Sequence, residues 1–123
     1  MGISKAAIAV TGLALSLGVG AALASTTTAS ATKTVTVAAG KPFEFAFGLS
    51  SRRAARGTTV SFRITNRGSG SHNFRILGKT SRTLRAGGTQ TVTVTFTRAG
   101  TYRYLCTLSG HASLGMKGTF TAS

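Results

Sequence analysis

The sequence predicts an all-β domain, an antiparallel Greek-key sandwich or barrel of seven to eight strands. Apolar residues recur at every second position in short runs, which is the pattern of strands with one buried face. Glycine and polar clusters separate these runs, where turns need a permissive backbone. Beyond the N-terminal apolar run, no segment has sustained helical periodicity. Short strands with turns at this spacing are typical of antiparallel sandwiches and barrels.

Three strands are expected in the first half of the domain. They contain Val35 and Val37, then Phe43, Phe45 and Phe47, then Val60, Phe62 and Ile64. The residues that alternate with them are polar or small, so each apolar set shares one face and is a candidate for the core. Between the second and third strands, residues 48–57 are expected to form an irregular insertion, either a helical turn or a loose surface segment.

The second half of the domain repeats this alternation. Its strands contain Phe74 and Ile76, then Val92, Val94 and Phe96, then Tyr102, Tyr104 and Cys106, and finally residues 117–122. Turns are expected at residues 67–71, 78–81, 86–88 and 98–100, which are rich in glycine and polar residues. The sequence contains no internal repeat, so these strands are expected to form a single domain.

The N-terminus is typical of a secretory signal peptide. Lys5 precedes an apolar run that ends in Ala22-Leu23-Ala24, a small-x-small cleavage site. We assign residues 1–24 to the signal peptide, with an alternative cut after residue 31, residues 25–32 to a flexible Ser/Thr/Ala lead, and residues 33–123 to the domain. The alternative is a retained anchor, because the run approaches the roughly 17 residues of a spanning helix. Export predicts a periplasmic, cell-envelope or extracellular location.

The mature region is strongly basic. The chain has 15 Lys and Arg residues against one acid, Glu44, and loss of the leader removes only Lys5, which leaves a formal +13. Such a field favours association with acidic proteins, acidic envelope polymers or membrane surfaces. Ten arginines could also form a nucleic-acid surface. The aromatic residues that would stack on bases occupy core positions, however, and export disfavours nucleic acid as the partner.

Cys106 is the only cysteine of the chain. It cannot form an internal disulfide, and a bare thiol is prone to oxidation in an oxidising compartment. A single cysteine is often an inert buried residue. In an exported domain, however, a single cysteine needs a partner that protects its thiol from oxidation.

Cys106 is followed by His111 and Met116 in the spacing C-x4-H-x4-M, on one loop between two predicted strands. The only other histidine, His72, lies at the mouth of another strand. Two imidazoles, one thiolate and a weak thioether match the ligand set of a blue-copper site. Zinc is the rival metal, but structural zinc sites use four Cys or His donors and this chain has three. The prediction is one type 1 copper ion.

In this pattern the sequence resembles the plastocyanin, azurin and auracyanin type of cupredoxin over residues 33–123. The matching motifs are His72-Asn73, Tyr104-Leu105-Cys106, Gly110-His111 and Gly115-Met116-Lys117-Gly118. The resemblance implies that His72, Cys106 and His111 are strong ligands, that Met116 is axial, and that Asn73 hydrogen-bonds near Thr107. The sequence departs from many relatives at Ser109, where they have proline, and it lacks the acidic patches of some plant relatives.

The resemblance implies a monomeric electron carrier between redox proteins, with its exit at the exposed edge of His111. The alternative is copper sequestration or delivery by the same site, and a structural basic adhesin would bind no metal. Cysteine-protease chemistry needs a thiolate, a histidine base and an orienting group, a role open to Asn73. A small sandwich without a further acid is a poor candidate for that chemistry. A multicopper oxidase would need more than two histidines, so no enzyme activity is expected.

Overall fold

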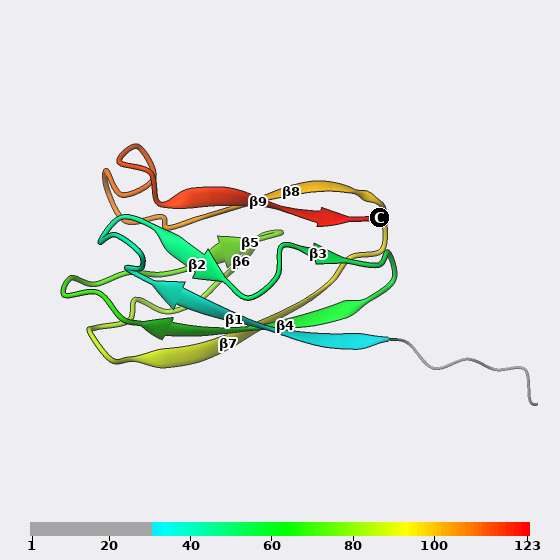
Figure 1. The fold of residues 1–123 in the computed structure, drawn as a ribbon, viewed down its shortest axis with the longest axis horizontal. Helices are drawn as coiled ribbons and strands as arrows, with labels where there is room; N and C mark the ends of the chain where they lie inside the picture. Colours follow the sequence, from blue (N-terminus) through cyan, green and yellow to red (C-terminus); the bar gives the residue numbers. More distant parts are fainter. Residues whose placement is uncertain (1–30) are drawn as a thin grey trace, which may run out of the picture.

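In the computed structural model, residues 31–123 form nine strands in two facing sheets (Figure 1). The strands are β1 (Thr32–Ala39), β2 (Phe47–Leu49), β3 (Arg53–Ala54), β4 (Thr59–Asn66), β5 (Arg75–Ile76), β6 (Lys79–Thr80), β7 (Thr89–Thr95), β8 (Gly100–Leu105) and β9 (Lys117–Ala122). One sheet has the order β2-β1-β4-β7 and the other β3-β9-β8-β5-β6. The expected all-β sandwich is confirmed.

The structure describes residues 31–123, so the predicted signal peptide and nearly all of the lead lie outside the described residues. The retained anchor, the alternative to cleavage, also lies outside them. Within residues 31–123, no helix is long and apolar enough to cross a membrane.

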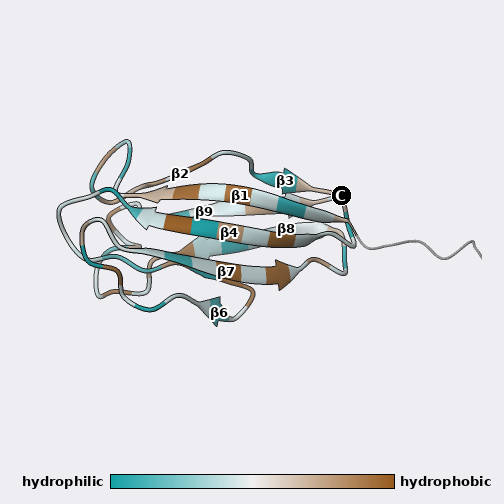
Figure 2. Ribbon diagram, turned by 90° about the horizontal axis from the view of Figure 1, so that it is seen from below, coloured by the Kyte–Doolittle hydropathy of each residue, from teal (hydrophilic) through white to brown (hydrophobic). Residues whose placement is uncertain are grey.

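Aromatic side chains fill the space between the two sheets. Phe62 of β4 packs on Phe74 at 5.3 Å and on Phe120 of β9 at 5.2 Å between ring centroids. The alternation of apolar and polar residues is visible along β1, β4 and β7 (Figure 2), with the apolar side facing the other sheet. Full burial of a Phe side chain stabilises the fold by about 1.5–3 kcal/mol. The alternation therefore fixes which face of each sheet is buried.

The prediction of purely antiparallel sheets is wrong for two strand pairs. β1 runs parallel to β4, and β3 runs parallel to β9. Parallel neighbours need a crossover of a dozen or more residues, and residues 40–58 supply one between β1 and β4. This segment leaves the first sheet after β2 and places β3 at the edge of the second (Figure 1). The sheets are thus mixed.

The strand predicted around Phe43, Phe45 and Phe47 begins only at Phe47. Residues 42–45 form a bend, and Phe43 is 75% exposed rather than part of the core. The carboxylate of Glu44 accepts hydrogen bonds from the backbone of Ser69 and Gly70, which holds this segment outside the sheet. The alternation of phenylalanines in the sequence therefore does not mark one continuous strand.

The insertion expected at residues 48–57 holds no helical turn; it contains the end of β2 and all of β3. The turn expected at residues 78–81 contains β6, which forms a hairpin with β5. The described residues form nine strands rather than seven or eight because two short strands, β3 and β6, lie where an insertion and a turn were expected.

Three loops meet at one end of the sandwich: residues 40–46, 67–71 and 106–116 (left in Figure 1). Gly40 has φ +86° and lies against the next loop, so a Cβ there would be 2.5 Å from the Cα of Gly68. Only glycine allows this backbone conformation and this approach together. The close contact brings the 40–46 and 67–71 loops together beside His72.

Candidate metal centre

His72, Cys106 and His111 are brought together at this end of the sandwich. One ligand atom from each lies within 4.8 Å of the others. The Nδ1 atoms of the two histidines are 3.2 Å apart, and Cys106 Sγ is 3.5 Å from His111 Nδ1. His72 and Cys106 are fully buried, whereas His111 is partly exposed. The three donors thus converge on one point just below the surface.

The loop from Cys106 to Met116 closes on itself through its backbone. Cys106 N–H donates to the carbonyl of Met116 at 3.1 Å, and Met116 N–H donates to the carbonyl of His111 at 3.1 Å. Gly110 and Gly115 take φ values of +81° and +118°, which the turns of this loop require. Met116 is fully buried beside Cys106. Its role as the axial ligand stays a prediction.

Asn73 links the segment of His72, which forms an isolated bridge with Leu84, to the loop of Cys106. Its Nδ2 donates to Thr107 Oγ1 at 2.7 Å, and its Oδ1 accepts from Thr107 N–H at 2.8 Å. Its backbone N–H lies 3.5 Å from Cys106 Sγ and points at the sulfur. The hydrogen bonds expected between Asn73 and Thr107 are therefore present, and they orient the thiol from outside the ligand set.

Glu44 is a site residue that the sequence reasoning missed. Its Oε2 lies 2.6 Å from His72 Nε2, and both its oxygens accept from the 67–71 loop through Ser69 and Gly70. These backbone hydrogen bonds, first from Ser69 and then from Gly70, together with the bond to His72, lower the pKa of Glu44 to about 2. Glu44 is therefore a carboxylate at neutral pH. The sequence did contain one indication of a special role for Glu44, because it is the only acidic residue of the chain.

Phe45, expected in the core, is partly buried against its edge and also covers the two histidines. Its ring centroid is 5.0 Å from that of His111 and 6.2 Å from that of His72, both edge-on. An apolar ring in this position limits access of water to the imidazoles. The 40–46 loop thus contributes two neighbouring residues to the centre, a carboxylate and an aromatic shield.

The donor set fits copper. His72 uses Nε2 toward Glu44, so its Nδ1 is the atom that faces Cys106 and His111. A carboxylate on the outer nitrogen of a ligating histidine fixes its orientation and raises its basicity. One thiolate and two imidazoles in a compact group match a blue-copper site, with a weak axial position left for a thioether. His72, Cys106 and His111 are the one such donor group within residues 31–123.

Comparisons with known proteins agree with this geometry. The family model for copper binding proteins of the plastocyanin/azurin family matches residues 19–123. A search of curated proteins found no match. Auracyanin A from Chloroflexus aurantiacus is 24% identical with a TM-score of 0.65, over 75% of this chain and 99% of that chain.

Two further solved structures share the fold. Rusticyanin from Thiobacillus ferrooxidans is 27% identical with a TM-score of 0.59, over 77% of this chain and 79% of that one. A multicopper oxidase is 19% identical with a TM-score of 0.56, over 77% of this chain and 39% of that one, and this likeness concerns the fold alone. The match to the family model and the His-Cys-His cluster lead to one conclusion: the chain belongs to the plastocyanin/azurin family of copper-binding proteins, the cupredoxins, and its cofactor is one type 1 copper ion.

Proposed function

We propose that this protein is an exported carrier of single electrons between redox proteins. The observation that carries the proposal is the His72-Cys106-His111 cluster, held by hydrogen bonds from outside the ligand set. A bound copper ion supplies a one-electron Cu(II)/Cu(I) couple. Asn73 fixes Cys106 and Glu44 fixes His72, so neither donor has to move when the charge at the centre changes. Because the donors keep their positions, little structural rearrangement of the site accompanies each electron transfer.

The exit for the electron is the exposed edge of His111. Of the three large apolar side chains that are exposed among the described residues, Phe43 (75%) and Leu114 (64%) lie in the loops at the metal end. Exposed apolar groups gathered in one place mark an interaction surface. A partner that docks there reaches His111 without crossing the sandwich.

The partners we propose are acidic redox proteins, met by a monomer in the periplasm, the cell envelope or the extracellular space. The support is the formal +13 of the mature region and the signal-peptide pattern of residues 1–24. A field of this size steers acidic partners and raises their rate of encounter. Acidic envelope polymers or membrane surfaces are further targets for the same charge.

The test begins with Cu(II) added to the purified protein. An intense blue absorption is expected from the wild type and none from Cys106→Ser, which keeps the fold but removes the thiolate. A colourless wild type would contradict the proposal. Cyclic voltammetry then separates the two roles of a copper site: reversible one-electron reduction with the metal retained supports electron transfer, whereas loss of copper on reduction supports sequestration or delivery.

A further inference from the structure

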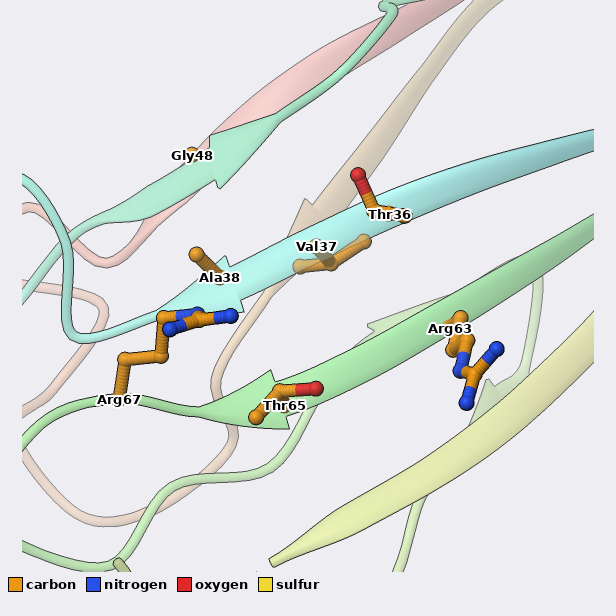
Figure 3. A pocket seen from close by; sticks show the side chains of 7 residues that line it. All are labelled: Thr36, Val37, Ala38, Gly48, Arg63, Thr65 and Arg67. Atoms are coloured by element: carbon orange, nitrogen blue, oxygen red, sulfur yellow. The ribbon is translucent and has the colours of Figure 1, made fainter. Parts of the chain in front are cut away.

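A basic cleft opens on the solvent-facing side of the sheet β2-β1-β4-β7. It has a volume of about 390 Å³. Figure 3 shows its lining residues: Thr36, Val37, Ala38, Gly48, Arg63, Thr65 and Arg67. The short residues Ala38 and Gly48 face each other across the β1–β2 pair and leave room above the backbone. Arg63 of β4 lies on one side of this space, and Arg67, the residue that follows β4, lies on the other.

The sheet register sets the positions of the polar groups in the cleft. Thr36 of β1 pairs with Arg63 of β4, and Ala38 pairs with Thr65, so the hydroxyls and the guanidinium share the outer face. Arg67 N–H donates to the carbonyl of Ala39 at 2.8 Å, which anchors the second arginine at the end of the same strand pair. The cleft therefore presents two cations and two hydroxyls on a rigid support.

Neither arginine is neutralised within residues 31–123. The one carboxylate side chain of the chain, Glu44, is engaged with Ser69, Gly70 and His72. Among the described residues, the one side-chain contact of ion-pair length is that between Glu44 and His72, at 2.6 Å, so no carboxylate side chain pairs with either arginine. Two guanidinium groups beside the same cleft repel each other unless an anion lies between them. Their charge is thus available to a ligand.

We propose that this cleft binds the phosphate groups of an anionic polymer. Guanidinium groups bind phosphate oxygens through paired, charge-assisted hydrogen bonds, and threonine hydroxyls can donate to the remaining oxygens. A phosphate has oxygens in several directions and can reach an arginine and a hydroxyl together. The lining residues include no aromatic side chain, so bases would find no stacking partner there. A phosphate polymer without bases is therefore the expected ligand.

The cleft reaches the metal end only at Arg67, the first residue of the 67–71 loop. The cleft lies on the broad side of the sandwich, whereas the 106–116 loop lies at its end (Figure 1). A protein held on a phosphate-rich layer through this side would still expose Leu114 and the edge of His111. Binding at the cleft and docking of a redox partner are thus compatible.

The test measures binding of inorganic polyphosphate to the copper-loaded protein by calorimetry at about 0.15 M salt, where surface charges are screened beyond about 8 Å. The double variant Arg63→Gln/Arg67→Gln is expected to bind about tenfold more weakly or worse. The matched control, Arg98→Gln/Arg103→Gln, loses the same charge elsewhere, with Arg103 on the opposite sheet. It is expected to lose less than about threefold. An unchanged blue absorption checks that both variants are folded.

Three outcomes would overturn the proposal. Equal weakening in the two double variants would mean attraction to net charge alone. Equal affinity for poly-glutamate of the same length would remove the preference for phosphate. Tighter binding of single-stranded DNA than of polyphosphate would point to a nucleic-acid ligand.

NMR locates the binding site directly. In the diamagnetic Cu(I) protein, polyphosphate should shift the backbone amide signals of Thr36, Gly48 and Thr65 most strongly. Shifts confined to another face would also contradict the assignment.

Discussion

Glu44 places a negative charge against a ligand of the metal centre in a chain that is otherwise basic. Its carboxylate bonds to His72 Nε2 and, at the same time, to backbone N–H groups of the 67–71 loop. One side chain thus orients the imidazole, joins two loops and changes the electrostatic environment of the copper site. The first two effects depend on hydrogen bonding, and the third depends on charge.

Glu44→Gln keeps a side-chain oxygen but removes the charge. We expect the reduction potential to rise, because a nearby carboxylate stabilises Cu(II) more than Cu(I). A tenfold shift in the one-electron equilibrium corresponds to about 59 mV, and we expect a rise of about this size. Ser69→Ala is the control, since it removes one hydroxyl contact to Glu44 and keeps the charge. Voltammetry that gave one potential for all three proteins would contradict a role for this charge.

Asn73 and Thr107 are expected to differ in importance although they bond to each other. Asn73→Ala loses two hydrogen bonds and leaves Thr107 N–H without its partner, whereas Thr107→Ala loses only the bond from Asn73 Nδ2. Each hydrogen bond within a folded protein contributes about 0.5–1.5 kcal/mol to stability, and Asn73→Ala loses two where Thr107→Ala loses one. Urea unfolding of the copper protein should therefore show the larger loss for Asn73→Ala, together with a shifted blue band. Equal losses would count against this assignment.

At the scale of elements, alternation predicts which long strands exist but not how they pair. β1, β4 and β9 contain the alternating residues expected for them, whereas β7 ends one residue before Phe96 and β8 ends one residue before Cys106. Parallel and antiparallel strands with one buried face show the same alternation, so the parallel pairing of β1 with β4 could not be predicted from it. β3, β5 and β6 are too short to show a period. The bend at Glu44 depends on residues 25 and more positions away.

Gly118 of β9 and Tyr104 of β8 pack closely against each other across the strand pair. Gly118 pairs with Tyr104, and the tyrosine ring lies across the position that a Cβ of Gly118 would occupy. Gly118→Val should therefore displace the ring, with an overpacking cost of about 1–3 kcal/mol, and disturb Cys106 two residues further along. Val at the neighbouring exposed position, Thr119→Val, is the control. Thermal unfolding that gave the same loss for both variants would show that this packing is not limiting.

At the scale of the whole molecule, the site was more predictable than the fold that builds it. His72, Cys106, His111 and Met116 stand in an order that a sequence displays directly, because three of them share one loop. Glu44 and Phe45 belong to the centre only because the 40–46 loop packs on the 67–71 loop. Contacts of that kind arise from the folding of the whole chain, and no local spacing predicts them.

The net charge makes opposite predictions for two electron-transfer reactions of this protein. Transfer to an acidic partner should slow as salt rises, because screening removes the attraction; the Debye length falls from about 30 Å at 0.01 M to about 8 Å at 0.15 M. Self-exchange between two copies, both strongly basic, should accelerate over the same range because screening removes a repulsion.

Stopped-flow measurement of the first reaction and NMR line broadening of the second, on the same copper-loaded protein, would check both signs. A salt effect on the copper centre itself would move the two rates in the same direction. Opposite directions therefore assign the effect to long-range charge. If neither rate responded to salt, the basic surface would have no part in bringing redox partners together, and its role would be confined to binding of other anions.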